Sequence, residues 1–365
     1  MNWKKMLKFA GISMGICLAL VAGGFVAYSQ MFQAPEVTVA RPSFMMRQDS
    51  VIGDTNNYLD GWDADFSEAL AFVPEPFVDN WDDWDRKENF YTILVLAIDD
   101  HRNSDVMWLV SFDTENHEMH IIDIPRDLRV PVAPRNVQRI NAAYSSGRIR
   151  DGHDEGIRQA KWEVSWLIGF RVDFYVSVEM SAFARAIDDI FGGVTVTVPF
   201  PMVYYSPLQN LHINLPAGTQ RLNGTQAVHF ARWRQQTDHT GNIGTARRGE
   251  HIFHLFESLA REAWGRMPGF LRQVPAIIDI YDRYVSTNLG TTNMLYFAEQ
   301  FLLNNVAIHY HRIPTSHIAR PRWYDIPYHD ETLELINATI NPFTRNIEII
   351  MPTEMPDIDF EEDEE

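Results

Sequence analysis

The chain has 365 residues, of which 45% are hydrophobic, enough for one large domain with appendages or for two domains. Its net charge of −18 argues against a broad nucleic-acid-binding surface. The one cysteine, Cys17, excludes an intramolecular disulfide, and no Cys/His zinc pattern is present.

Residues 9–28 form an uncharged apolar stretch. A helix of this length spans about 30 Å, the thickness of the hydrocarbon core of a bilayer. Three lysines precede the stretch, and the next charge after it is Glu36. The positive-inside rule therefore makes residues 1–8 a cytoplasmic tail. A cleaved signal peptide is the alternative, but the apolar run is longer than a typical signal-peptide core. We predict a single-pass protein of the cell membrane with its main domain extracellular.

Residues 29–89 are irregular, with scattered prolines, many acidic residues and interleaved tryptophans. This composition is typical of a stalk that folds back through its aromatic side chains or of a solvated acidic linker. We expect the folded domain to begin at residue 90.

From residue 90 onwards, short apolar runs alternate with helical patterns. Tyr91–Ile98 is a continuous apolar run of strand length, as expected for a strand covered on both faces. The other predicted elements are a hairpin of Val106–Phe112 and Glu118–Ile124, strands over Val172–Val178 and Val194–Val198, and helices over Glu155–Gly169, Ser181–Ile190, Thr225–Ala231 and from about Thr245. Strands that alternate with helices predict an α/β fold, an αβα sandwich with a mixed central sheet, spanning residues 90–265.

Residues 266–315 are predicted to be a C-terminal helical part of the domain. Within it, residues 286–289 are a plausible cap for a helix that carries Leu295, Phe297 and Phe301. Residues 316–365 are predicted to be an irregular extension, and eight of its last twelve residues are acidic. We expect that acidic tail to be disordered.

Two acidic side chains flank a short loop between two predicted strands. Asp99 follows the first strand, and Asp105 precedes the second. Two carboxylates at such a position can share a Mg²⁺ ion, which prefers few protein ligands and completes its shell with water and phosphate oxygens. The alternative is that both residues simply form the turn, since Asp and Asn are common there.

Arginines occur near the ends of several predicted elements. Arg126 follows a strand, with Asp127 beside it, and a structural Arg–Asp pair is the alternative to a ligand contact. Arg232 and Arg234 are two residues apart, so in an extended segment both guanidiniums point to one side and form a fork for adjacent phosphates.

Arg247 and Arg248 follow near the start of the next helix, whose N-terminus also favours anions. In a chain with a net charge of −18, such arginines indicate a binding site for a phosphorylated ligand. The alternative is that they are ordinary surface arginines.

The ordered set of motifs resembles the LytR-CpsA-Psr family over roughly residues 90 to 265. The matching motifs are Asp99, Asn103-Ser104-Asp105, Ile124-Pro125-Arg126-Asp127, Arg139-Ile140-Asn141-Ala142-Ala143-Tyr144, Phe191-Gly192-Gly193-Val194, Leu215 to Ala227, and Arg232-Trp233-Arg234. Each motif is weak by itself, but seven in the same order make a specific signal.

The resemblance implies transfer of a glycopolymer, such as a teichoic acid or capsular chain, from an undecaprenyl diphosphate carrier to peptidoglycan. It also implies a hydrophobic groove for the polyprenyl tail, Mg²⁺ as cofactor, and the membrane but no nucleic acid as a partner. The site residues that it implies are Asp99, Asp105, Arg126 and Asp127 as catalytic groups, Asp99 and Asp105 as metal ligands, and Arg126, Arg232, Arg234, Arg247 and Arg248 as diphosphate-binding arginines.

The chain also departs from the family pattern. Asn103 stands where the family has arginine, and Asn242, Thr245 and Gly249 replace an acid, an arginine and a glutamine. These changes leave a second hypothesis open, a non-catalytic scaffold of envelope assembly that binds polyprenyl diphosphate. A transcriptional regulator is disfavoured by the predicted anchor and by the acidity of the chain.

Overall fold

The computed structural model describes residues 32–37, 85–99, 103–130, 139–207, 211–237, 244–265, 278–279, 283, 285–318, 324–348 and 350. The predicted membrane anchor, the acidic tail and most of the predicted stalk lie outside these residues. Within the described ranges, no helix is both long enough and apolar enough to cross a bilayer.

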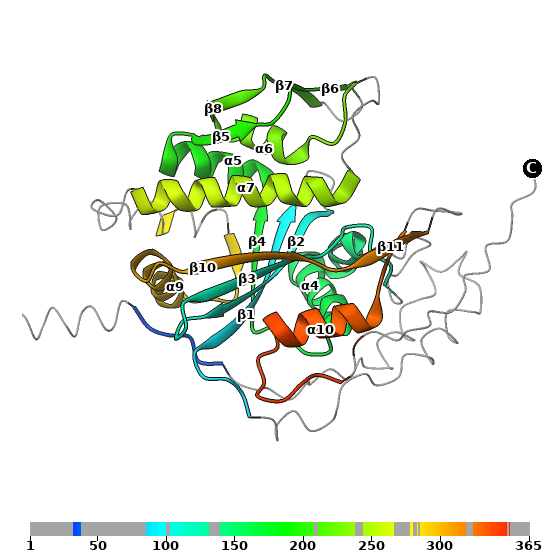
Figure 1. The fold of residues 1–365 in the computed structure, drawn as a ribbon, viewed down its shortest axis with the longest axis vertical. Coiled ribbons are helices and arrows are strands. Elements are labelled where there is room, and N and C mark those ends of the chain that lie inside the picture. The colour runs from blue at the N-terminus through cyan, green and yellow to red at the C-terminus, as the bar shows by residue number, and fades with distance from the viewer. Residues whose placement is uncertain are drawn as a thin grey trace, which may run out of the picture.

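A six-stranded mixed sheet with the strand order β10-β3-β2-β1-β4-β9 lies at the centre of the fold (Figure 1). Its strands are β1 (Phe90–Ile98), β2 (Ser104–Asp113), β3 (Glu118–Asp123), β4 (Phe174–Glu179), β9 (Val285–Thr287) and β10 (Ala307–Arg312). β1 runs antiparallel to β2 and parallel to β4, and β10 runs parallel to β3. The predicted α/β class with a mixed sheet is confirmed.

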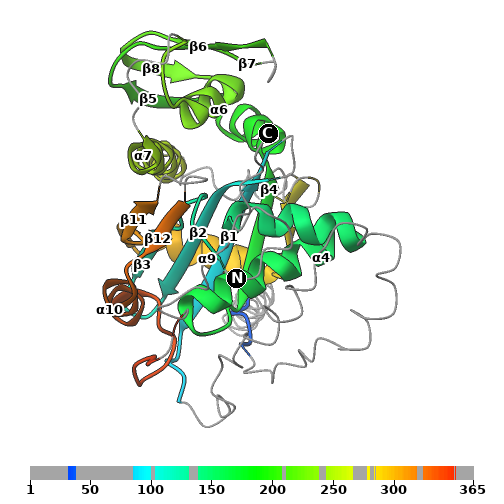
Figure 2. The ribbon, with the colours of Figure 1, turned by 90° about the vertical axis from the view of Figure 1, so that its right-hand side faces the viewer.

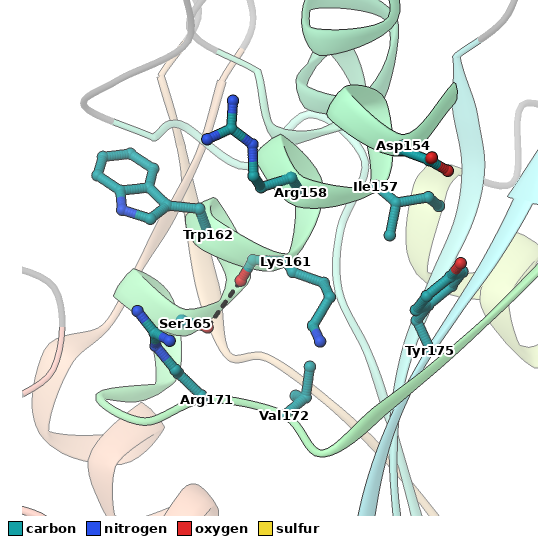
Figure 3. Close-up of a pocket in the computed structure, with 9 residues that line it drawn as sticks. All are labelled: Asp154, Ile157, Arg158, Lys161, Trp162, Ser165, Arg171, Val172 and Tyr175. Atoms are coloured by element: carbon teal, nitrogen blue, oxygen red, sulfur yellow. Dashed lines mark hydrogen bonds between the residues drawn. The ribbon is translucent and has the colours of Figure 1, made fainter. Parts of the chain in front are cut away.

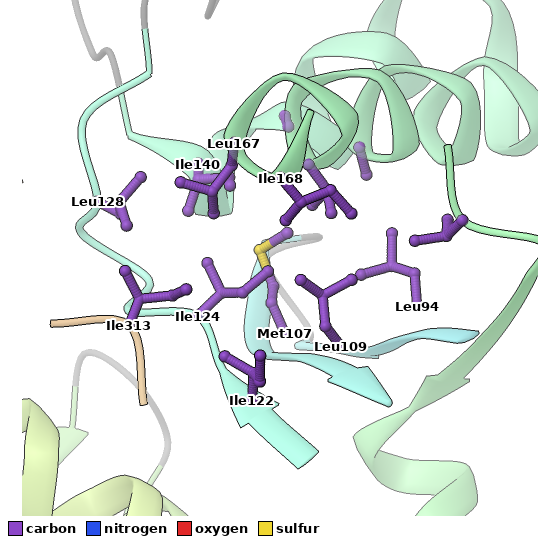
Figure 4. Packing of buried hydrophobic residues seen from close by; sticks show 14 of the residues in the cluster. Leu94, Met107, Leu109, Ile122, Ile124, Leu128, Ile140, Leu167, Ile168 and Ile313 are labelled. Carbon is purple, nitrogen blue, oxygen red and sulfur yellow. The ribbon is translucent and has the colours of Figure 1, made fainter. Parts of the chain in front are cut away.

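One face of the sheet packs on α4 (Ala143–Ile168) and α10 (His329–Thr339). Because side chains alternate along a strand, Leu94, Leu96 and Ile98 of β1 all point to this face, where they are almost fully buried. Figure 4 shows this core, in which Leu167 and Ile168 of α4 lie over the strands.

The opposite face is covered by α7 (Gly244–Gly265) and α9 (Thr291–Leu303). Trp108 of β2 meets Phe256 of α7 edge to face, with ring centroids 5.8 Å apart. Tyr91 of β1 meets Phe297 of α9 in the same way at 5.0 Å. Helices therefore cover both faces of the sheet.

A second, smaller unit lies on the far side of α7 (Figures 1 and 2). It consists of α5 (Met180–Ala186), a π-helical turn (Ile187–Phe191), β5 (Val194–Val198), β6 (Met202–Ser206), β7 (Leu211–Leu215), β8 (Gly218–Leu222) and α6 (Gly224–Arg232). β5 pairs with β8 and β6 with β7, both antiparallel. Its own core includes Phe230 and Trp233 and reaches Leu255 of α7, so α7 joins the two apolar cores.

The structure corrects three sequence-based expectations. The helix predicted from Glu155 is present, but a helical stretch that was not predicted precedes it from Ala143, and the two are separated by a kink with non-helical backbone at Asp151 and Gly152. Residues 286–289 are no helix cap, since β9 ends there and Gly290 precedes α9.

The third correction concerns the stretch after residue 306. β10 joins the central sheet, and the region predicted to be irregular forms β11 (Thr315–Ile318), β12 (Tyr324–Pro327) and α10. β10 pairs in parallel with β3, which lies far from it in the chain. A local sequence pattern cannot predict such a long-range pairing.

Candidate functional site

A carboxylate surrounded by arginines lies where β1 and β2 meet at their connecting loop. Asp105, the second residue of β2, has a side chain only 7% exposed. Its Oδ1 accepts a hydrogen bond from Nη1 of Arg126 at 3.0 Å, and Nη2 of Arg248 lies 3.0 Å from its Oδ2. Nη2 of Arg234 lies 4.0 Å from Oδ1. Asp105 thus joins three of the predicted arginines.

The segment that follows β3 holds Arg126 and Asp127 in place. The backbone amide of Asn141 donates to the carbonyl oxygen of Arg126 at 3.2 Å, and the amide of Ile140 donates to that of Leu128 at 2.9 Å. The two motifs at residues 124–127 and 139–141 are therefore one structural unit, although the chain between them is long.

Asp127 is held between two arginines in this unit. Its Oδ2 lies 3.5 Å from Nε of Arg126, and its Oδ1 lies 3.3 Å from Nη1 of Arg139. Arg139 was recognised as part of a motif but was not predicted as a site residue. The available signal was its position in that motif, two residues before Asn141.

Arg232 and Arg234 are positioned by the end of α6. The helix ends at Arg232, and Trp233 continues in an extended conformation (φ −64°, ψ 135°), as the fork prediction requires. Trp233 is buried against Phe200, with ring centroids 5.1 Å apart. This buried anchor places the guanidiniums of its two neighbours near Asp105, whose pKa both of them lower.

Part of the motif before Arg232 stabilises α6 and its surroundings. Asn223 and Gln226 form a reciprocal capping box at the start of the helix. Gly224 lies so close to α5 that a Cβ atom there would be 1.8 Å from the carbonyl oxygen of Ala184. Arg221 donates to the carbonyl oxygens of residues 191–193 and so closes the turn before β5. These residues orient the fork without being part of it.

Arg248 lies beneath Asp105 in the first turns of α7. Its side chain is 5% exposed, and its Nε donates to the carbonyl oxygen of Ala231 at 3.3 Å. Arg248 therefore links α7, α6 and β2 as well as facing the site. The side chains of Thr245 and Arg247 and all of Asn242 lie outside what the structure describes.

Asp105 carries a charge despite its burial. Burial raises the pKa of its carboxyl group, but the guanidiniums of Arg248, Arg126, Arg234 and Arg232 outweigh burial and hold the pKa below its ordinary value of 3.8. Partial burial, together with Arg248 and Arg126, lowers the pKa of Arg234 to about 10. Both groups are ionised at neutral pH.

Asp99 lies at the end of β1 and closes the loop between the two strands. Its Oδ1 accepts a hydrogen bond from the amide of Asn103 at 2.8 Å, which leaves Oδ2 for another partner. The carboxylates of Asp99 and Asp105 are oxygen donors of the kind that suits Mg²⁺. In the described part of the chain, no group of three or more His, Cys, Asp or Glu side chains converges on one point. Two carboxylates at this loop suit Mg²⁺, which takes few protein ligands and completes its shell with water or substrate oxygens.

Gly249, which replaces a glutamine of the family pattern, allows α7 to approach β3 and β10 closely. A Cβ atom there would lie 2.5 Å from the hydroxyl of Tyr310 and 2.7 Å from Oδ2 of Asp123. Asp123 is buried and forms an ion pair with Arg312. The substitution thus fits a buried polar cluster directly behind Arg248.

The arginines outnumber the carboxylates at this edge of the sheet, which we call the arginine rim. Arg126, Arg139, Arg232, Arg234 and Arg248 surround Asp105 and Asp127. Guanidiniums bind phosphate oxygens through paired N–H donors, so this excess of positive charge is suited to a ligand with several phosphate oxygens. The rim lies at strand ends in an α/β fold, where such folds commonly bind ligands.

Comparisons with known proteins identify the family of this chain. The sequence model of the LytR_cpsA_psr family matches residues 73–339, which confirms the resemblance drawn from the motifs. The chain is 32% identical over 180 residues to the polyisoprenyl-teichoic acid–peptidoglycan teichoic acid transferase TagV of Bacillus subtilis (strain 168). That match covers 47% of the chain and 44% of the relative.

A second relative is the corresponding transferase TagU of Oceanobacillus iheyensis, 28% identical over 265 residues, or 70% of the chain and 76% of the relative. The chain thus matches less than half of the length of TagV and about three quarters of TagU. The crystal structure of B. subtilis TagV has the same fold, with a TM-score of 0.54, 24% identity, and coverage of 69% of this chain and 96% of that one.

Proposed function

The chain belongs to the LytR_cpsA_psr family, and we propose that it transfers a glycopolymer from a polyprenyl diphosphate carrier to peptidoglycan. The observation that carries the proposal is the ring of arginines around the ionised Asp105. A diphosphate offers two adjacent anionic groups, which match the fork of Arg232 and Arg234 and the neighbouring Arg126.

In the reaction, a sugar hydroxyl of peptidoglycan attacks the phosphorus that carries the glycan. A new P–O bond forms to the acceptor oxygen, the bond to the bridging diphosphate oxygen breaks, and polyprenyl phosphate leaves. The hydroxyl proton passes to a carboxylate at the rim, Asp99 or Asp127. The arginines stabilise negative charge as it develops on the phosphate oxygens.

Mg²⁺ would be held by Asp99 and Asp105 together with oxygens of the diphosphate. When bound, it would neutralise part of the phosphate charge. Both Asp105 oxygens face guanidiniums in the free protein, so the arginines would turn toward the phosphate oxygens as the substrate enters.

The polyprenyl tail would enter on the α7 side of the sheet, where the side chains of β2 and α7 pack on each other and would have to separate to admit it. Val106 directly follows Asp105, and it belongs to the same buried cluster as Trp108 and Phe256. The uncharged segment 9–28 would anchor the chain in the membrane, with the domain outside, where carrier lipid and peptidoglycan meet.

The test uses the full chain in detergent with a radiolabelled lipid-linked glycan and purified peptidoglycan, in the presence of Mg²⁺. Removal of one charge-stabilising group should reduce the transfer rate by about 10²–10³-fold, as in other sites of this kind. We expect this loss in Asp105→Ala and in Arg232→Ala, measured as label fixed to peptidoglycan.

Arg261→Gln is the matched control, because this arginine of α7 is 70% exposed and distant in sequence from the rim. If transfer survives in both Asp105→Ala and Arg232→Ala, the site assignment is wrong. Binding of the carrier lipid without any turnover in the wild-type chain would instead favour the scaffold hypothesis.

A further inference from the structure

A cavity of about 350 Å³ lies on α4, away from the arginine rim. It is bounded by one side of α4 from residue 154 to 165 and by residues 171–175, which lead into β4. Tyr175 pairs with Leu94 in the middle of β1, whereas the rim lies beyond the end of β1 at Asp99. Figure 3 shows the side chains that line it. The cavity is therefore separate from the proposed transfer site.

Two cationic side chains in this cavity have no anionic partner among the described residues. Lys161 and Arg171 are both partly buried, and neither forms an ion pair within the described ranges. The nearby Asp173 is already engaged, because its Oδ2 accepts hydrogen bonds from the amide and hydroxyl of Thr92 and pairs with Arg86. In Figure 3, the Lys161 side chain extends from α4 toward Val172.

An unpaired ammonium group in a partly buried position is unfavourable for the free protein. Burial lowers the pKa of Lys161, and Arg171 lowers it further, although Asp173 acts in the opposite direction. Burial also lowers the pKa of Arg171. A bound anion beside the Lys161 ammonium would remove this cost, and Arg171 adds a second positive charge on the other side of the same cavity (Figure 3).

The rest of the lining combines aromatic and apolar side chains with the carboxylate of Asp154, the hydroxyl of Ser165 and Arg158, which forms an ion pair with Glu155. Trp162 and Tyr175 are partly exposed to the cavity, and Ile157 lies at its base. Asp154, at the opposite end from Arg171, is exposed and can accept hydrogen bonds from hydroxyl groups (Figure 3). Binding sites for small molecules typically combine apolar and aromatic walls with a few polar groups, and this volume is near the lower end of their range.

We propose that this cavity binds a single sugar ring that carries a phosphate or a carboxylate group. The anionic group lies beside Lys161, the ring lies against Tyr175, and its hydroxyls face Asp154 (Figure 3). A neutral sugar would leave Lys161 unpaired, so the anion is the main determinant of recognition. The site is a second ligand site of the domain and does not depend on the transfer reaction.

Isothermal titration calorimetry of the full chain in detergent tests the proposal, with glucose 6-phosphate, glucuronate and glucose as probes. We expect both anionic sugars to bind, and glucose to bind at least about tenfold more weakly, since charge-assisted hydrogen bonds are lost. Lys161→Met should weaken binding of the anionic sugars by about tenfold or more, and Arg171→Gln should weaken it less, because its charge is farther from the bound anion.

Two further variants locate the binding. Arg261→Gln, on the exposed part of α7, should bind the anionic sugars as the wild type does. Arg234→Gln separates binding in this cavity from any binding of the probes by the arginines of the rim: the binding that Lys161→Met removes should persist in Arg234→Gln. The proposal is overturned if the anionic sugars do not bind the wild type. It is also overturned if Arg234→Gln abolishes binding while Lys161→Met retains it.

Thermal unfolding of the sugar-free protein gives a second measurement. Because Lys161 has no ion-pair partner in the described ranges, Lys161→Met should unfold at the wild-type temperature or above it. A clear decrease would show that the lysine stabilises the fold itself, which contradicts a role in ligand binding.

Discussion

Two buried carboxylates in this domain, at the arginine rim and inside α4, have opposite charge states. Asp105 is surrounded by guanidiniums, and its pKa is lowered despite its burial. Glu163 is 1% exposed and accepts one hydrogen bond, from Nε2 of Gln159 at 2.9 Å. Burial raises the pKa of Glu163 to about 8, although Gln159 and Arg150 act in the opposite direction. Glu163 is therefore mainly neutral at pH 7.

The difference shows what distinguishes a binding site from a buried polar contact in this fold. Both carboxylates are removed from water, so burial by itself cannot explain their charge states. At the rim, several arginines lower the pKa of Asp105 and keep it ionised. The same arginines can bind a phosphate ligand. Around Glu163 there is one amide donor, which suits a neutral acid and offers nothing to an anionic ligand.

The largest expected effect is the loss of the Asp105 charge. Asp105→Asn leaves Arg126 and the buried Arg248 without their carboxylate partner, and removing one member of a buried ion pair typically costs about 3–5 kcal/mol. Chemical denaturation at pH 7 should show a loss of this order. Asp330→Asn, at a side chain that is 97% exposed, should cost at most about 1 kcal/mol.

The pH dependence sharpens this test. Because the native pKa of Asp105 is lowered, its stabilising contribution is fully present above pH 3.8 and is lost as pH falls through the native value. The difference between wild type and Asp105→Asn should therefore shrink in acid. A difference that is constant from pH 7 to pH 2.5 would contradict the assigned charge state.

Glu163 should show the opposite dependence. Native Glu163 keeps its proton up to about pH 8, whereas the unfolded chain releases it near pH 4.5. The unfolding free energy therefore falls as pH rises between these values, by on the order of 3 kcal/mol at pH 7. Glu163→Gln should lose this dependence, so its stability relative to wild type should rise from pH 4.5 to pH 8.

The control is Glu334→Gln, at an exposed position of α10, which should track wild type across the same pH range. Parallel curves for wild type and Glu163→Gln would show that Glu163 is ionised in the native protein, and the contrast with Asp105 would then fail.

Gly249→Ala should have a smaller effect, on the packing behind the rim. Its Cβ would meet the hydroxyl of Tyr310 and the carboxylate of Asp123, and overpacking of this kind typically costs about 1–3 kcal/mol. Gly265→Ala on the same helix, where a Cβ meets no atom within 4 Å, should be neutral or slightly stabilising. Equal stabilities for the two variants would show that α7 does not approach β3 as described.

The sequence predicted the central hairpin and β5 well, because each is a short apolar run bounded by turn residues. It also placed α6 within one residue at each end, as Thr225–Ala231 for a helix that spans Gly224–Arg232. It failed beyond residue 306, where β10 owes its conformation to pairing with β3. It also missed Arg139, whose ion pair with Asp127 depends on a contact across a loop.

The family, the α/β class and the identity of most charged residues at the rim followed from the sequence alone, because ordered motifs and hydrophobic periodicity are local properties of the chain. The charge states of Asp105 and Glu163, the burial of Arg248 and the cavity beside Lys161 were decided by the tertiary structure. Each of these depends on distances between side chains from separate elements and on how completely water is excluded. A linear pattern does not encode either quantity.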